Sequence, residues 1–293
     1  SIAYGIEEHR FEGKVYLGGN YASCCWYKFN FSECCRSGPI NTGHSWANFS
    51  TELWLNRCIT PCDNGPEFKN PPIAIKCAGQ DVIYNHGVVD EDGDSLVYRK
   101  ALPNGASYSS PWSVNYPLTC YPGNHANATP CPTCTPPFGF YLDPQIGDMI
   151  FRPMQQQETV LKVKVEEWRK INGVYQLIGI ATRDMQFIIL ANCSNKNPTI
   201  SSLQPFEVCT GSTLCFYINT NDQDFADTTR IYWDNSIPGA SWSSNNGTVK
   251  RAQGQFCWTP TEADASTLPY YFRATVEDDH CPLNGRATRA YTI

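Results

Sequence analysis

Two parts of the chain carry the same pattern, and this repeat limits the fold more than any other feature of the sequence. Residues 147–153 match residues 254–260 position for position: each run has a glycine, a polar residue, three apolar residues, a polar residue and a proline. Residues 164–167 and 275–278 form a second matching pair, in the same order along the chain. One folding unit has therefore been used twice.

The repeated unit is predicted to consist of β-strands. The chain has 21 Gly, 21 Pro and 13% aromatic residues but only 17% charged residues, which suits strands and turns better than helices. Short runs rich in Val, Ile, Tyr, Phe and Trp lie between turn residues, and no long segment has apolar residues at helical spacing. The sequence therefore predicts an all-β protein whose repeats are β-sandwiches.

Charge and hydropathy exclude two kinds of partner. A net charge of −6 and a pI near 5.4 argue against binding to nucleic acid or to an anionic membrane surface. No apolar run is long enough to insert in a bilayer, and no signal peptide opens the chain. Strand-like sequence begins directly at Ser1, so we expect a segment of a longer polypeptide with any export signal upstream.

Turn-rich stretches divide the chain into three predicted domains. Boundaries fall in the Pro- and Gly-rich run 64–72 and near residues 195–198. The predicted units are a Cys-rich N-terminal β domain at 1–70, a sandwich at 71–195 and a second sandwich at 196–293. A Pro- and Cys-rich insertion at about 111–137 interrupts the middle unit and is expected to be a surface loop and a candidate binding surface.

Fifteen cysteines indicate an oxidising compartment and several disulfides. In the third domain we predict the pairs Cys215–Cys257 and Cys209–Cys281, because both tie early strands to late ones. Cys77 and Cys193 bracket the middle domain and are predicted to close it. The odd number of cysteines leaves at least one thiol free or paired between chains.

The remaining cysteines allow more than one arrangement. Cys24–Cys25 and Cys34–Cys35 are vicinal pairs, so one cysteine of each pair should point inward on a strand while the other reaches Cys58 or Cys62. A four-cysteine zinc site is the alternative, although metal-binding spacing occurs in this region only at Cys58 and Cys62. In the insertion we expect a structural disulfide or a small metal knot, formed from Cys120, His125, Cys131 and Cys134.

An acidic loop precedes a strand in each repeat. Three aspartates alternate along residues 90–94, and Gly93 between them permits a tight turn. Hard cations such as Ca²⁺ bind six to eight oxygen ligands of this kind, and the spacing differs from that of an EF-hand. We predict that the acidic loop of each repeat meets an acidic residue at the end of a later strand. The predicted ligands are Asp90, Asp92, Asp94 and Glu167 in the second domain, and Asp222, Asp224 and Asp278 in the third. The alternative is an acidic turn whose charges are simply solvated.

The sequence gives little support for catalysis. It has no helical zinc motif, no nucleophile elbow and no phosphate-binding glycine loop. Adjacent carboxylates such as Glu166 and Glu167 point to opposite faces of a strand and make a poor glycosidase pair. We therefore predict that the protein is not an enzyme. Two sets of aromatic residues differ in expected role: Trp168, Trp233 and Trp258 in the core; Trp112, Trp242 and Tyr121 near loops, available to stack on glycans.

Several short motifs together resemble a known group of proteins. The acidic run 90–98 is similar to cadherin-like and PKD-like modules of bacterial surface proteins. Other runs, in this order, resemble large secreted proteins of the Bacteroidota that use the type nine secretion and gliding-motility machinery: 34–36, 167–169, 182–186, 256–260 and 278–282. The resemblance implies tandem immunoglobulin-like sandwiches in a long extracellular protein that acts as an adhesin, stalk or filament. The high cysteine content departs from that group.

The sequence as a whole predicts a disulfide-braced, Ca²⁺-stiffened extracellular segment at the cell surface. Its expected partners are other domains of the same polypeptide, neighbouring subunits and surface glycans. Two alternatives stay open: a secreted carbohydrate-binding or glycan-processing protein, and a self-assembling extracellular fibre subunit.

Overall fold

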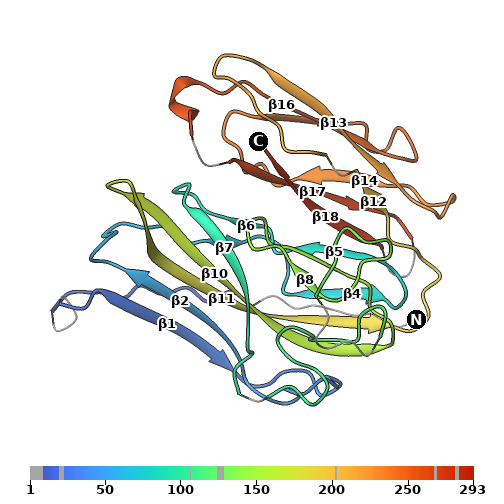
Figure 1. The fold of residues 1–293 in the computed structure, drawn as a ribbon, viewed down its shortest axis with the longest axis horizontal. Helices are drawn as coiled ribbons and strands as arrows, with labels where there is room; N and C mark the ends of the chain where they lie inside the picture. The colour runs from blue at the N-terminus through green and yellow to red at the C-terminus, as the bar shows by residue number, and fades with distance from the viewer. Residues whose placement is uncertain are drawn as a thin grey trace.

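The prediction of an all-β protein is confirmed by the computed structural model, which describes residues 9–19, 23–105, 107–123, 129–201, 203–266, 269–280 and 284–293. Within these ranges the regular structure is almost entirely β, apart from short 3-10 turns such as η2 (Glu262–Asp264). No helix among these residues is long and apolar enough to span a membrane. Figure 1 shows two stacked β-units, with the orange and red strands of the third domain above the cyan and green strands of the second.

The upper unit is a sandwich of two sheets. One sheet has the order β12-β13-β16-β15 and the other β14-β17-β18. Their bounds are β12 Thr199–Ile200, β13 Leu214–Asn221, β14 Arg230–Trp233, β15 Ser241–Ser244, β16 Gln253–Trp258, β17 Tyr271–Glu277 and β18 Arg286–Thr292. Numbered A to G along the chain, the sheets are ABED and CFG, which is the topology of an immunoglobulin constant-type domain.

Alternating side chains fill this sandwich. Along β13 every second residue is buried, as expected of a strand with one face on the core. Phe256 of β16 stacks on Phe272 of β17 with ring centroids 4.3 Å apart, which joins the two sheets. Cys215 and Cys257 stand directly opposite each other on β13 and β16 and form a disulfide within one sheet.

The lower unit repeats this plan. A sheet with β4, β11, β10 and β7 faces a sheet with the order β5-β9-β8. Their bounds are β4 Ile73–Cys77, β5 Val82–Asn85, β7 Ser95–Ala101, β8 Tyr141–Leu142, β9 Asp148–Phe151, β10 Gln157–Ile171 and β11 Val174–Leu190. The matching runs 147–153 and 254–260 include β9 and β16, each of which pairs with the second strand of its sandwich. The repeat therefore holds in topology except at the first strand, since β4 pairs with β11 whereas β12 pairs with β13 in the other sheet.

The N-terminal strands extend the lower sheet. β1 (Trp26–Glu33) pairs with β2 (Phe49–Asn56), and β2 pairs with residues 179–182 of β11. β11 is long enough to pair with β4 at residues 186–190 as well. A short two-stranded sheet, β3 (Glu67–Phe68) with β6 (Val88–Val89), crosses the predicted boundary near residue 70. Strands from the predicted N-terminal domain thus continue the middle unit (Figure 1), and an independent fold for residues 1–70 stays a prediction.

Part of the insertion lies inside the lower unit. Tyr116, Leu118 and Cys120 belong to its buried core, together with Phe140 and Phe151. The expectation that the whole of residues 111–137 is a surface loop is therefore wrong for this part, because its apolar side chains are needed to cover the sheet.

Candidate metal centre

Carboxylates from three separate segments meet at one end of the lower unit. Asp63 follows β2, Asp90 and Asp94 lie in the loop before β7, and Glu167 lies on β10 at a β-bulge. Carboxylate oxygens of Asp90, Asp94 and Glu167 lie within 4.8 Å of one another, and so do those of Asp63, Asp92 and Asp94. We call these five residues the first acidic pole.

Glu167 is the most unusual member of the first acidic pole. Its side chain is fully buried at 0% exposure, and neither carboxylate oxygen has a hydrogen-bond partner among the described residues. One oxygen of Asp63 and one of Asp90 are also buried without a partner. Burial, followed by the neighbouring Asp90 carboxylate, raises the pKa of Glu167 well above its usual range. An isolated buried carboxylate is costly, so this cluster requires a compensating cation or protons.

Arg169 compensates only part of this charge. Its Nε donates to Asp94 Oδ1 at 2.7 Å, and its Nη2 donates to Asp63 Oδ1 at 2.8 Å and to Asp92 Oδ2 at 3.3 Å. Glu167 receives neither a hydrogen bond nor an ion pair from this guanidinium. In the part of the chain that the structure describes, Arg169 is thus the one cation paired with these five carboxyl groups.

Asp92 is held by Asn64. It accepts hydrogen bonds from the backbone N–H of Asn64 at 2.8 Å and from the Asn64 side-chain amide at 3.1 Å. The backbone hydrogen bond is the main cause of its lowered pKa. The structure thus brings Asp90, Asp94 and Glu167 together and places Asp92 on the Arg169 side. Sequence reasoning missed Asp63, although its place in the turn-rich linker beside Asn64 offered a signal.

The donor set fits a hard divalent cation. Ca²⁺ takes six to eight oxygens from carboxylates, carbonyls and water in flexible geometry. The first acidic pole offers carboxylate oxygens, and those of Asp90, Asp94 and Glu167 lie close enough together to share one ion. These residues would hold the ion.

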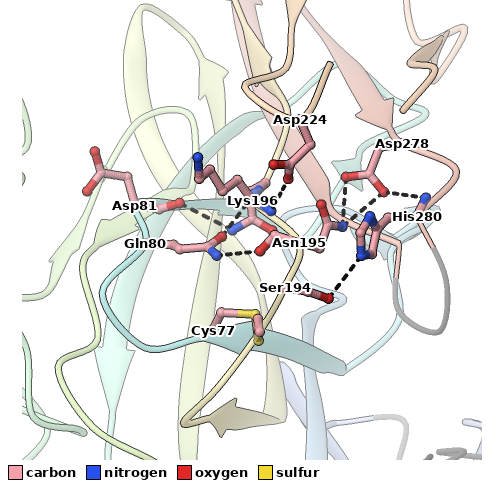
Figure 2. The surroundings of a disulfide bond; sticks show 11 residues. Cys77, Gln80, Asp81, Ser194, Asn195, Lys196, Asp224, Asp278 and His280 are labelled. Carbon is pink, nitrogen blue, oxygen red and sulfur yellow. Dashed lines mark hydrogen bonds between the residues drawn. A yellow bond between two sulfur atoms is a disulfide. The ribbon is translucent and has the colours of Figure 1, made fainter. Parts of the chain in front are cut away.

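A second acidic pole lies in the upper unit, at the joint with the lower one. Asp222, Asp224 and Asp227 have carboxylate oxygens within 4.8 Å of one another. Asp278, predicted as the third ligand, is not in this group. Its oxygens accept from the Asn195 amide at 2.9 and 3.1 Å and from the Gly285 N–H at 2.8 Å (Figure 2).

The two poles use equivalent positions. The Asn64 N–H bonds to Asp92, and correspondingly the Lys196 N–H bonds to Asp224 at 2.7 Å (Figure 2). The other equivalent pairs, first pole then second, are Asp63 and Asn195, Asp90 and Asp222, Glu167 and Asp278, and Arg169 and His280. The two poles differ most at one of these positions. The Asn195 amide donates hydrogen bonds to Asp278, whereas the equivalent residue of the first pole, Asp63, has a carboxylate instead of an amide.

Five disulfides join cysteines among the described residues. Cys77 and Cys193 are joined beside the linker between the units (Figure 2). Further bonds join Cys25 to Cys58, Cys34 to Cys35 and Cys131 to Cys134. The zinc alternative is therefore wrong for Cys25 and Cys58, because disulfide sulfurs are not thiolate ligands. Cys209 is exposed, and its predicted partner Cys281 lies outside the described residues.

Of the two arrangements predicted for the insertion, the structural disulfide is confirmed and the metal knot is wrong. Cys131 and Cys134 are joined by a disulfide, and Cys120 is buried in the core, where burial raises the pKa of its thiol. His125 lies outside the described residues.

A chain of hydrogen bonds crosses the joint. Ser194 Oγ lies 3.1 Å from His280 Nε2 (Figure 2), and His280 Nδ1 lies 2.9 Å from Asp227 Oδ2. This connectivity matches that of a hydrolase triad. Here it joins the linker to a loop of the upper unit.

The aromatic residues predicted near loops are largely packed. Trp112 packs against the lower core and Trp242 stacks on Trp233 with ring centroids 5.9 Å apart. Tyr121 is half-buried. Trp258 is buried in the upper core as expected, while Trp168 is half-buried, with an unpartnered indole N–H. Trp112, Trp242 and Tyr121 are therefore partly buried rather than fully exposed, and their stacking on glycans stays a prediction.

Known proteins offer distant likenesses only. No protein-family model matches the sequence, and no curated protein does. Among solved structures, a complex of Dpr2 Ig1-Ig2 with DIP-Theta Ig1-Ig3 is 12% identical over 78% of this chain and 98% of that one, with a TM-score of 0.25. A PcdhgB3 EC1-4 structure is 11% identical over 92% of this chain and 66% of that one, also at 0.25. The four N-terminal Ig domains of Dscam1 are 9% identical over 84% and 58%, at 0.27. Likenesses at this level say nothing about what the chain binds.

Proposed function

We propose that this chain is a non-catalytic segment of an extracellular adhesion protein, and that Ca²⁺ at the first acidic pole stiffens it. The buried, unpartnered carboxylate of Glu167 carries this proposal. A cation there would neutralise Glu167, Asp90 and Asp94 together. Because Arg169 links Asp94 to Asp63, which follows β2, the ion would also help to fix the N-terminal hairpin against the sandwich.

Several features support an extracellular role in adhesion. Disulfides of this number persist in oxidising compartments. Stacked sandwiches suit a stalk or filament that joins neighbouring domains or subunits. Motif order alone supports display on a bacterial surface by type nine secretion, with a role in gliding motility. Secretion of the chain fused to candidate export signals would test that attribution.

The second acidic pole is not included in this proposal. Asp278 is already satisfied by Asn195 and Gly285, so it has no need of a metal. Ca²⁺ binding at Asp222, Asp224 and Asp278 stays a prediction from the sequence.

The test is a thermal melt of the non-reduced chain, with chelator and then with Ca²⁺. Binding to the native state alone stabilises it by mass action, by about 2.7 kcal/mol when the free ion is at 100 times its Kd. For a chain of this size we expect a Tm increase of roughly 5–10 °C, which Mg²⁺ does not reproduce.

A matched pair of variants identifies the ligand. Glu167→Gln should remove the response to Ca²⁺ and raise the Tm in chelator, because the amide is neutral and removes the cost of keeping a buried carboxylate protonated without the ion. Glu166→Gln should retain the response, since Glu166 points to the opposite face and pairs with Arg99 and Lys164. An equal Ca²⁺ response in wild type and Glu167→Gln would refute the proposed site.

A further inference from the structure

A cleft of about 320 Å³ lies between the two units. One wall is the outer face of β14, β17 and β18, and the other is formed by Lys69, Asn70 and Gly87 of the lower unit. This volume lies at the small end of the range for ligand pockets, roughly 300–1,000 Å³. The acidic poles contribute none of its lining residues.

The upper wall of the cleft offers an aromatic surface. Tyr232 is 44% exposed and is the cross-strand partner of Thr275, whose hydroxyl bonds to that of Thr288 at 2.9 Å. Trp233 contributes to the lining while packing on Phe256 and Phe272 behind it. The phenol ring is thus a rigid apolar surface with a polar tip, of the kind that binds amphipathic ligands.

The charged groups in the cleft are already paired. Arg273 Nη1 lies 3.3 Å from Asp234 Oδ2, and Arg286 Nε lies 3.3 Å from Glu277 Oε1. The Arg286 guanidinium also donates to Asn70 Oδ1 at 3.4 Å. Donors and acceptors therefore alternate along the lining. A strongly charged ligand would have to separate these pairs, whereas hydroxyl groups can donate to the carboxylates and accept from the guanidinium groups.

Buried contacts fix the two walls relative to each other. Arg273 is buried, and its Nε donates to Asn85 Oδ1 at 2.9 Å in the lower unit. Its Nη2 lies 3.3 Å from the Tyr98 hydroxyl. On the other side of the interface, buried Lys76 donates to the backbone carbonyl of Arg286 at 2.6 Å. A ligand in this cleft therefore meets a preorganised site, which lowers the entropic cost of binding.

We propose that this cleft binds a neutral saccharide unit, with an apolar face of the sugar ring on Tyr232 and its hydroxyls on Asp234, Glu277 and Arg286. A sugar combines C–H faces with hydroxyls that both donate and accept, which matches the aromatic wall and the paired charges. This site is independent of the Ca²⁺ proposal, since its lining contains no residue of the acidic poles.

The test begins with an array of neutral and sialylated or sulfated glycans, probed with the intact chain in chelator. We expect binding to neutral glycans, retained without Ca²⁺. The best neutral oligosaccharide is then titrated while tryptophan fluorescence is recorded, because Trp233 lines the cleft.

Three variants connect that binding to the cleft. Tyr232→Ala should weaken the affinity about tenfold or more, and Glu277→Gln severalfold. Tyr217→Ala is the matched control, because Tyr217 is 53% exposed on β13, in the other sheet of the same sandwich. Binding to acidic glycans only, no glycan binding, or an unchanged affinity in Tyr232→Ala would overturn the proposal. If the Ca²⁺ response is absent while glycans still bind, the metal-site proposal is contradicted and the saccharide proposal stands.

Discussion

Gly179 of β11 leaves the space that the Glu167 carboxylate occupies. The two residues are cross-strand partners, and a Cβ atom added at Gly179 would lie 2.1 Å from Glu167 Oε2. Gly285 has the same relation to Asp278 in the upper unit, where an added Cβ would lie 2.3 Å from Asp278 Oδ2. Each unit therefore has a carboxylate on a late strand or at its end that depends on a nearby glycine.

Gly179→Ala should displace Glu167 and weaken Ca²⁺ binding. We expect the Ca²⁺-induced Tm increase to fall by at least half, because the added methyl group meets the carboxylate in a fully buried site. Gly285→Ala is the comparison. It should lower the Tm in chelator, since its Cβ would also lie 2.6 Å from Pro198 Cδ, but keep the Ca²⁺ response. Equal Ca²⁺ responses in the two variants would contradict the assignment.

Residues 63 and 195 occupy equivalent positions, and exchanging their side chains should change the stability of each unit without Ca²⁺ in opposite directions. Asp63→Asn copies Asn195 into the first acidic pole, so we expect a higher Tm in chelator and a smaller gain from Ca²⁺. Asn195→Asp removes the amide that bonds to Asp278 and sets two buried carboxylates together, which should cost about 3 kcal/mol. Isothermal titration with CaCl₂ and melts in chelator measure both effects. A Tm in chelator that is unchanged in Asn195→Asp would show that the amide is not what satisfies Asp278.

Because Asp148 is buried, we expect the free energy of unfolding to decrease as the pH rises and this carboxyl group loses its proton. Burial raises its pKa to about 6 from an ordinary 3.8, although the Asn85 amide donates to it at 2.7 Å. A carboxyl group with a raised folded-state pKa contributes stability that is fully present below about pH 4 and is lost as the pH rises through about 6. The difference corresponds to about 3 kcal/mol.

Asp148→Asn is the variant that checks this dependence. Urea unfolding of wild type and variant between about pH 4 and pH 7.5 should give a variant free energy of unfolding with a flatter pH profile. Parallel profiles would mean that other groups account for the pH dependence.

Ser194 should be unreactive despite its hydrogen bond to His280. Catalysis by a serine triad needs an acyl substrate beside the serine and groups that stabilise the oxyanion. We propose that the hydrogen bonds of Ser194 and His280 serve instead to hold the linker. A fluorophosphonate probe should therefore leave Ser194 unlabelled in intact protein, with a serine hydrolase as the positive control. Labelling that disappears in His280→Ala would mean that the protein is an enzyme.

Some features of this protein could be predicted from local sequence. Strand periodicity predicted the all-β class, because alternate burial depends on neighbouring residues in the chain. The repeat predicted two copies of one unit, and the structure gives β9 and β16 the same place in their sheets. The cysteine pairs Cys77–Cys193 and Cys215–Cys257 followed from their positions at early and late strands, and both are joined in the structure.

Only the tertiary structure decided how the poles and the cleft are composed. Asp63 reaches Asp94 and Arg169 because β2 pairs with β11, a contact between residues more than a hundred positions apart. Asp278 is satisfied by Asn195 because the linker folds back on the upper unit, and the cleft exists because β18 packs on β5. The sequence by itself determined which residues alternate on a strand and which carry charge. Which charges meet, and which are left buried without a partner, was decided by strand pairing and by the packing of one sandwich on the other.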